Sequence, residues 1–191
     1  MTKTPRRRPR QMTLFEKDQP GDSVQVDVKV IRLANEKVFQ YPALDDCTRM
    51  RVLRLYPRQN QHASLDVLRE LTDALPFAIR KIQCDNGSEC PLAFRLAVEA
   101  AGMRHRYIKP RRPQQNGKVE RSHRIDGEEF WDLHEFTDRA DAEPRLRDGE
   151  RRYNHERFSR ALAGRTPAEK LAAKLTLALP PSASPLSEVT A

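Results

Sequence analysis

At 191 residues, the chain is long enough for one well-buried domain with a helical appendage and too short for two ordinary domains. It contains no run of 18 apolar residues, and its first thirty residues are basic and then polar, so we expect neither membrane insertion nor secretion. The three cysteines lack CxxC spacing, which argues against a disulfide framework and a four-thiolate zinc site, so we expect reduced thiols in a cytoplasmic protein.

The net charge of +8 is concentrated in two segments of the sequence. Residues 1–10 carry five basic side chains and no acidic one, and residues 104–124 carry eight basic side chains against a single acidic one, Glu120. A positive charge gathered in this way is typical of a surface that binds phosphate. Nucleic acid is therefore the expected partner, and no membrane partner is expected.

Residues 1–22 are rich in Pro, Arg, Lys and Asp and predict a flexible basic arm. A strand follows, because valines alternate with polar residues in "VQVDVKVIRL". The alternation places Val24 and Val30 on one face and Asp27 on the other, in the middle of the strand. The segments "VFQYPAL" and "RMRVLRLY" predict two further strands, which form an antiparallel meander with the first.

The pattern then changes to helices that alternate with strands. Leucines at helical spacing predict a helix over residues 60–75, which Pro76 ends. The segment "FAIRKIQC" predicts a strand that places Asp85 directly after its carboxyl end. A helix over residues 91–102 and a last strand in "MRHRYI" complete an α/β layered domain, with a mixed five-stranded sheet flanked by helices.

The remaining sequence predicts a loop and two helices. "KPRRPQQNG" is a basic, proline-rich loop, and a helix begins at Asn116. Asn116, Glu120 and Arg124 share one face of this helix because they are four residues apart. A second, strongly charged helix covers residues 138–158. These patterns divide the chain into a core over residues 23–135, a C-terminal helical extension over 136–175 and a disordered tail over 176–191.

Three carboxylates occupy places where they can meet. Asp27 lies within a strand, Asp85 at a strand end and Glu120 near the start of a helix, so adjacent parallel strands and a helix across their ends would bring them together. Three converging carboxylates repel one another unless divalent cations lie between them. Mg²⁺ prefers oxygen ligands, and two ions ~3.5–4 Å apart support an in-line displacement at phosphorus. We expect two Mg²⁺ ions, with Mn²⁺ as an alternative.

Each carboxylate also has a simpler explanation. Asp27 alone would be a solvent-facing strand residue, and Asp85 before Asn-Gly would be a turn residue. Glu120 would merely pair with Arg124 at i+4. Asp45 and Asp46, in "ALDDCTR", are expected to shape a turn between two strands rather than to bind metal. The joint order of the three acids and their context favour the metal site.

Several segments together resemble a known family. They are "VQVDVK", "ALDDCTRM", "CDNGSE", "HRYIKPRRPQQNGKVERSHR" and "YNHERFSRALAGRTPAEKL". They are similar to the integrase-type catalytic core of bacterial insertion-sequence transposases, which is related to retroviral integrases, over roughly residues 20–172. The resemblance implies a ribonuclease H-like fold and an Asp, Asp, Glu triad at Asp27, Asp85 and Glu120, with 34 residues between the last two.

The resemblance also implies a function and partners. A transposase core cleaves DNA and transfers the freed strand with the help of Mg²⁺, acts on the element ends and on target DNA, and assembles as a homo-oligomer that brings two ends together. We therefore expect a cytoplasmic, nucleoid-associated bacterial protein. The expected DNA-binding residues surround Glu120, although a solvated basic face is the alternative; they are Lys109, Arg111, Arg112, Asn116, Lys118, Arg121 and Arg124.

Two features depart from the family pattern. Cys84 and Cys90 stand where family members commonly have a threonine and an aromatic residue. Nothing in the sequence resembles the helix-turn-helix region that recognises terminal repeats, so we expect this domain to be missing or supplied by another chain. Two other hypotheses stay open: a catalytically inactive DNA-binding or oligomerising fragment, and a ribonuclease H-like enzyme that cuts RNA in hybrids.

Overall fold

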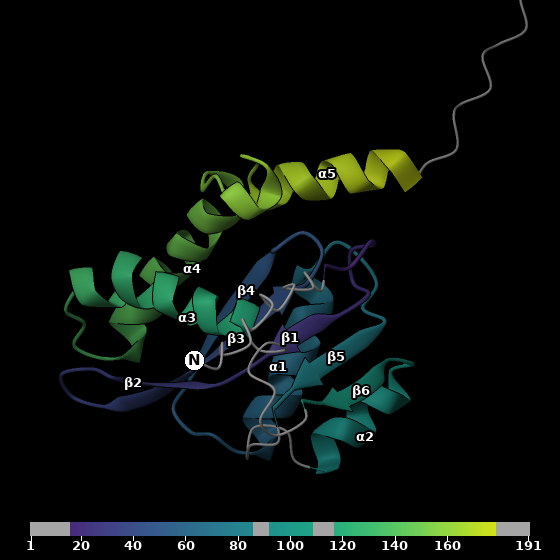
Figure 1. Cartoon of the computed structure of the whole chain (residues 1–191). Helices are drawn as coiled ribbons and strands as arrows, with labels where there is room; N and C mark the ends of the chain where they lie inside the picture. The colour runs from purple at the N-terminus through teal and green to yellow at the C-terminus, as the bar shows by residue number, and fades with distance from the viewer. Residues whose placement is uncertain (1–15, 86–91, 109–116, 179–191) are drawn as a thin grey trace, which may run out of the picture.

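A mixed β-sheet runs through the centre of the protein and carries helices on its faces (Figure 1). The computed structural model describes residues 16–85, 92–108 and 117–178. Among these residues, no helix has the length and apolar character needed to span a bilayer. The elements in chain order are β1 (Val24–Val26), β2 (Lys29–Arg32), β3 (Lys37–Asp45), β4 (Arg51–Tyr56), α1 (Gln61–Ala74), β5 (Lys81–Cys84), α2 (Leu92–Ala100), β6 (Arg104–Tyr107), α3 (Gly117–Glu129), the 3₁₀ helix η2 (Trp131–Leu133), α4 (Arg139–His155), the 3₁₀ helix η3 (Arg160–Leu162) and α5 (Pro167–Ala178).

The sheet has six strands in the described part of the chain, rather than the five that the sequence predicts. Strand β3 pairs antiparallel with β4 along one edge and with β1 and β2 along the other. Strand β1 then pairs parallel with β5, and β5 pairs parallel with β6. The meander and the later change to parallel pairing agree with the predicted order. The additional strand arises because the first predicted strand is divided at Asp27 and Val28.

A proline opposite Asp27 explains this division. Strands β1 and β2 keep one continuous register along β3, in which Asp27 is opposite Pro42. The Asp27 amide donates a hydrogen bond to the Pro42 carbonyl oxygen at 3.2 Å. Pro42 has no amide proton with which to return the second hydrogen bond of the pair. The ladder therefore lacks one bond at Asp27, while the chain itself continues in register.

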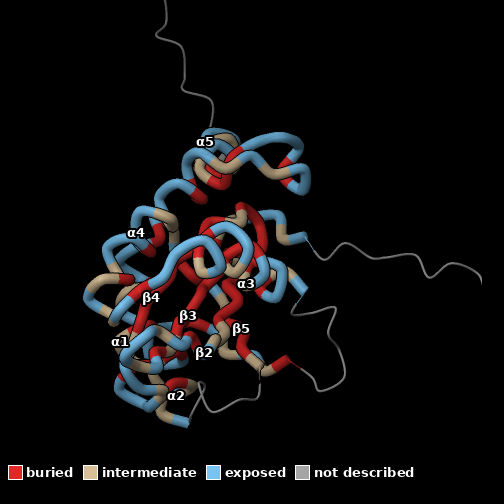
Figure 2. Tube along the Cα trace, turned by 90° about the vertical axis from the view of Figure 1, so that its left-hand side faces the viewer, coloured by how far each residue is buried: buried red, intermediate tan, exposed pale blue. Residues whose placement is uncertain are grey.

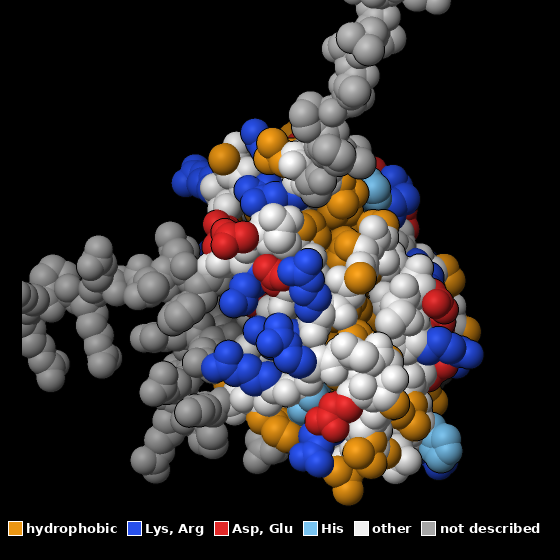
Figure 3. All heavy atoms as spheres, turned by 90° about the vertical axis from the view of Figure 1, so that its right-hand side faces the viewer, with side chains coloured by type: hydrophobic (Ala, Val, Ile, Leu, Met, Phe, Trp, Pro, Cys, Tyr) orange, Lys and Arg blue, Asp and Glu red, His pale blue; other side chains and the backbone are white. Residues whose placement is uncertain are grey.

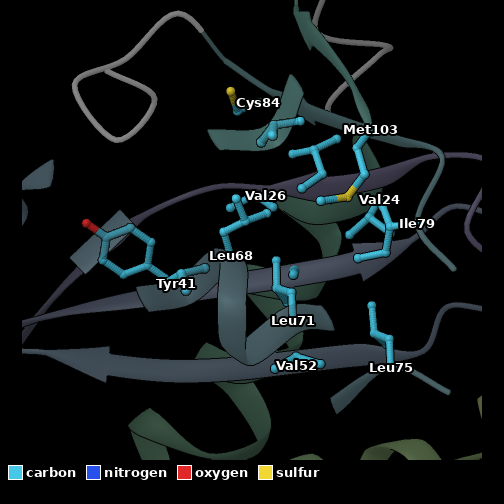
Figure 4. Close-up of a cluster of buried hydrophobic side chains, with 14 of the residues drawn as sticks. Val24, Val26, Tyr41, Val52, Leu68, Leu71, Leu75, Ile79, Cys84 and Met103 are labelled. Atoms are coloured by element: carbon cyan, nitrogen blue, oxygen red, sulfur yellow. The ribbon is translucent and has the colours of Figure 1, made fainter. Parts of the chain in front are cut away.

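Two hydrophobic cores lie on opposite faces of the sheet. The larger one packs Val24 and other β1 residues against Leu71 and the apolar side of α1 (Figure 4). The smaller one joins Ile31 on β2 to Leu146 on α4. Buried residues accordingly gather in the strands, whereas the helix faces that point away from the sheet are exposed (Figure 2). The predicted valine row ends before Val30, which is 49% exposed and belongs to neither core.

Helix α4 covers the outer edge of β4 with polar side chains. Asn154 accepts a hydrogen bond from the Arg51 amide at 3.0 Å and donates one to the Arg51 carbonyl at 2.8 Å. Two strand residues further on, the Leu53 amide donates to the Glu150 carboxylate. Four helix residues rise ~6 Å and two strand residues ~6.6 Å, so alternate strand positions match successive helix turns. The helix thereby satisfies backbone groups that a further strand would otherwise pair.

Asp45 shapes the turn after β3, as expected. Its carboxylate accepts hydrogen bonds from the Gly21 amide at 2.9 Å and from the Thr48 amide at 2.7 Å. Burial raises the pKa of Asp45, although these hydrogen bonds act in the opposite direction. Gly21 belongs to the predicted basic arm, residues 1–22. Its hydrogen bond to Asp45 joins this end of the arm to the turn after β3.

The cysteines differ from expectation at one position. Cys47 is a free, buried thiol, as the sequence predicts. Cys84 is disulfide-bonded, so the expectation that all three thiols are reduced is wrong for this residue. The absence of CxxC spacing excludes only pairs of cysteines that are separated by two residues.

Candidate active site

The strands that lead to Asp27 and Asp85, β1 and β5, are adjacent and parallel. The register pairs Gln25 with Gln83, and its continuation by two residues would set Asp27 beside Asp85. Adjacent strands lie ~4.8 Å apart, and residues paired in register point to the same face of a sheet. The predicted parallel pairing of the two strands is therefore confirmed, whereas the meeting of the two aspartates stays a prediction.

His123 of α3 contacts Asp27 across this face of the sheet. Its Nε2 lies 3.0 Å from Oδ2 of Asp27, and the other carboxylate oxygen accepts a hydrogen bond from the Val28 amide at 2.9 Å. The two side chains are only 14% and 16% exposed. Lys29 provides a second link, because its ammonium donates to the His123 carbonyl at 3.5 Å. The two contacts hold α3 across the strand that carries Asp27.

Glu120 lies on the same helix, one turn before His123, and is exposed. Three residues correspond to ~4.5 Å along the helix axis and to nearly the same side of the helix. Glu120 is therefore at the margin of the Asp27 site. Within residues 16–85, 92–108 and 117–178, no three His, Cys, Asp or Glu side chains form a group that could hold a metal ion. The convergence of all three carboxylates stays a prediction.

Lys118, one of the predicted DNA-binding residues, makes an ion pair within the protein. Its ammonium lies 3.1 Å from Oδ1 of Asp46 and 3.1 Å from the Asp46 carbonyl oxygen. Gln25 donates a hydrogen bond to the same carboxylate at 2.8 Å. Burial lowers the pKa of Lys118, while the nearby Asp46 raises it. Lys118 therefore fastens the first turn of α3 to the turn between β3 and β4.

The other predicted DNA-binding residues divide into two groups. Arg121 and Arg124 are exposed on α3, and Arg124 pairs with Glu128 at 3.5 Å. Their exposure is compatible with a phosphate contact. The second group lies outside the described residues and consists of Lys109, Arg111, Arg112 and Asn116.

A buried polar network beneath α3 was not predicted. Asp126 is 1% exposed, makes an ion pair with Arg51 and accepts a hydrogen bond from Gln40 at 2.8 Å. Trp131 donates to the Gln40 side-chain oxygen at 2.7 Å. Burial raises the pKa of Asp126, whereas Arg51 and Gln40 act in the opposite direction. Helical spacing from the buried Val119 would have placed position 126 on the inner face of the helix.

The donor chemistry of the site suits a hard divalent cation. Asp27 and Asp85 offer carboxylate oxygens from adjacent strands, and a cation between them would relieve their mutual repulsion. Glu120 is the third candidate ligand, presented by the helix that crosses this face. A mixed sheet in which an antiparallel meander continues into parallel strands, crossed by such a helix, has the arrangement of a ribonuclease H-like core.

Family comparison identifies this core more closely. A family model described as the integrase core domain matches residues 17–113, just over half of the chain, and another with the same description matches residues 101–167. The chain therefore belongs to the integrase core domain family, and it is a catalytic core of the transposase and integrase type. No curated protein shows a significant match to the sequence.

Solved structures confirm the fold. A chain of the simian T-cell lymphotropic virus intasome in complex with PP2A regulatory subunit B56 gamma matches with a TM-score of 0.77 and 18% identity, over 98% of this chain and 66% of that chain. The HTLV-2 integrase catalytic core domain in complex with magnesium matches with a TM-score of 0.64 and 14% identity, over 80% and 97%. The catalytic core domain of BIV integrase gives 0.62 and 19%, over 83% and 99%. The chain thus spans 66% of the simian viral chain and nearly all of each isolated core.

Proposed function

We propose that this integrase core cleaves DNA and transfers the freed strand by in-line phosphoryl transfer, with divalent metal ions held by Asp27, Asp85 and Glu120. The observation that supports the proposal is the parallel register of β1 and β5, whose continuation would bring Asp27 and Asp85 together on the face that α3 crosses. The magnesium in the HTLV-2 core supports Mg²⁺ as the ion, and Mn²⁺ has similar ligand preferences.

The protein's own residues position the reacting groups. His123 and the Val28 amide hold the Asp27 carboxylate, and β5 ends immediately before Asp85. The buried pair of Asp126 and Arg51 holds α3 against the sheet, and this contact would help to position Glu120. Mg²⁺, when bound there, would activate the attacking oxygen and stabilise the leaving oxygen.

We further propose that the active protein is an assembly of several copies on DNA. Exposed Arg121 and Arg124 would hold the phosphate backbone near the reacting bond. The HTLV-2 core is described in dimeric and trimeric forms, which supports a homo-oligomer that brings two DNA ends together. The element would be a bacterial insertion sequence, and a separate domain or chain would recognise its terminal repeats. The protein would act in the cytoplasm, on the nucleoid.

Replacement of Glu120 tests the proposal. The Glu120→Gln variant should bind duplex DNA with unchanged affinity, because the side chain keeps its size and is exposed. Its Mg²⁺-dependent cleavage and joining of plasmid DNA should fall at least about a hundredfold. Asp27→Asn should behave in the same way. Cleavage at the wild-type rate in either variant would show that these carboxylates do not hold the catalytic ions.

One observation favours a second candidate function, a DNA-binding or oligomerising core without catalysis. Glu120 is exposed, and the described residues contain no group of three potential ligands. Under this hypothesis the wild-type protein would shift duplex DNA in a gel but would neither cleave nor join it at any Mg²⁺ or Mn²⁺ concentration. A strand-joining assay on supercoiled plasmid therefore separates the two functions.

A further inference from the structure

Basic side chains occupy one face of the two last strands of the sheet. Ile82 and Cys84 of β5 face the larger core, so Lys81 and Gln83 face the opposite side. The parallel register pairs Lys81 with Arg104 of β6 and Gln83 with Arg106. Lys81, Arg104 and Arg106 therefore lie on the same face of the sheet as Asp27 and Asp85. We call these three basic residues the β5–β6 basic strip.

The strip has no helix packed over it among the described residues. Helix α2 lies on the other face, where His105 packs against Phe94. Helices α3 and α4 contact β3 and β4, at the far side of the sheet. Arg104 and Arg106 are exposed, and Figure 3 shows Lys and Arg side chains gathered near the middle of the corresponding side of the molecule. Within the described part of the chain, Arg104 and Arg106 are thus accessible to a partner.

The positive charge of the strip is not neutralised within the described part of the protein. None of its three residues forms an ion pair with another described side chain, in contrast to Lys118 and Arg80, which pair with Asp46 and Asp22. Like charges directly opposite one another on neighbouring strands are unfavourable. The β5–β6 basic strip therefore lowers the stability of the free protein. An anionic partner bound to the strip would offset this loss.

The environment of Lys81 supports this conclusion. Burial lowers its pKa, the nearby cations Lys17, Arg106 and Arg104 lower it further, and Asp46 acts in the opposite direction. The cross-strand pair of Arg32 and Lys37, at the far end of the β2–β3 hairpin, provides a comparison because both of its residues are exposed to water. Water screens the repulsion between Arg32 and Lys37. Lys81 is partly buried, so the repulsion between Lys81 and Arg104 is screened less.

The strip also leads towards the candidate active site. Lys81 and Asp85 lie on the same face of one strand path, four residues apart, which corresponds to ~13 Å. Each DNA strand carries one phosphate per ~3.4 Å of helix axis, so this distance spans about four nucleotides. A duplex lying along this face would place one phosphate at the carboxylates while its flanking phosphates reach the strip.

We propose that the β5–β6 basic strip binds the phosphate backbone of duplex DNA about four nucleotides from the bond that is cut. The placement next to the reacting bond depends on the proposed cleavage function, whereas the binding itself does not. The contacts are to phosphate, so they are independent of base sequence.

Salt-dependent binding tests the strip. The affinity of the full chain for a duplex is measured over a range of salt concentrations with EDTA present, so that no cleavage occurs. The double variant Arg104→Gln with Arg106→Gln should reduce the slope of log K against log salt by about two, since each phosphate contact contributes about 0.9. Arg104→Lys with Arg106→Lys should keep the wild-type slope. The matched control, Arg32→Gln with Lys37→Gln, should also keep it.

Two outcomes would overturn the proposal. One is an unchanged slope in the double glutamine variant whose thermal unfolding matches the wild type. The other is an equal loss in the Arg32 and Lys37 control, which would show that only total charge matters. Because the measurement excludes metal, a chain that never cleaves DNA can still confirm the strip. An active chain with an unchanged slope would refute the strip and leave the proposed function intact.

Discussion

The Nε2 atom of His123 lies 3.0 Å from Oδ2 of Asp27, and this contact joins helix α3 to the strand that carries the first aspartate of the site. The other ring nitrogen, Nδ1, is buried and has no hydrogen-bond partner among the described groups. The contact with Asp27 is therefore the one polar interaction that the structure gives the imidazole. We infer that His123 holds the orientation of the Asp27 carboxylate.

Removal of the imidazole should weaken the response to metal. His123→Ala should lower Mg²⁺ affinity or cleavage about 10–100-fold, because residues that orient a metal ligand usually have effects of this size. His123→Gln should retain much of the wild-type behaviour, since its amide can still donate to Asp27. The measurement is a Mg²⁺ titration, read both as cleavage rate and as the shift in thermal unfolding temperature. Equal Mg²⁺ midpoints in the wild type and the alanine variant would contradict the inference.

The ion pair of Lys118 with Asp46 should contribute to stability. Lys118→Met leaves the buried Asp46 carboxylate with only its hydrogen bond from Gln25, so the free energy of unfolding should fall by about 1–3 kcal/mol. Arg121→Met is the matched control, because Arg121 is one turn further along α3 and exposed, and it should change stability by less than about 0.5 kcal/mol. Urea denaturation measures both. Equal values would show that the ion pair adds no stability.

Asn154 should be important for stability because it satisfies both backbone groups of Arg51 at the edge of the sheet. Asn154→Ala leaves a buried amide and a buried carbonyl unpaired, each at a cost of about 1–3 kcal/mol. Arg152→Ala, on an exposed position of the same helix, is expected to have little effect. Chemical denaturation would contradict the assignment if the two variants unfolded at the same denaturant concentration.

Stability should decrease as the solution is acidified through the titration range of His105. Burial lowers the pKa of His105, Arg95 lowers it further and Glu99 opposes them, so the folded value lies below the ordinary 6.5. Between the two values the unfolded chain binds more protons than the folded one, and stability therefore rises with pH up to about 6.5 and then levels.

The substitution His105→Asn tests this pH dependence. It removes the titrating group, so the variant should lose part of the slope of unfolding temperature against pH below 6.5. His62 is exposed and its replacement by asparagine should leave the slope unchanged. A wild-type slope in the His105 variant would assign the pH dependence to other groups.

The strand and helix order was predictable from local sequence patterns. The helix expected over residues 60–75 is observed as α1, with Asn60 accepting a hydrogen bond from the Ala63 amide as its N-cap. The helix expected over 138–158 is observed over Arg139–His155, with Asp138 as its N-cap. Alternating valines, helical leucine spacing and capping residues act over a few positions, so they are readable without the fold.

The contacts that complete the site depend on distant parts of the chain. The contact of His123 with Asp27 joins residues 96 positions apart, and that of Asn154 with Arg51 joins residues 103 apart. Sequence patterns do not specify which polar side chains of one helix meet which strand. Pro42 was visible in "YPALD", but its effect on the β1–β2 ladder follows only from the register that sets it opposite Asp27.

The coverage of β4 by α4 has a consequence for any shortened chain. A chain ending at residue 135, the predicted limit of the core, would lose Glu150 and Asn154 and leave the amides of Arg51 and Leu53 without their present acceptors. A bare strand of this kind can pair with the same strand of another molecule. The isolated core would then be prone to self-association and loss of solubility, so helix α4 is an integral part of the folding unit.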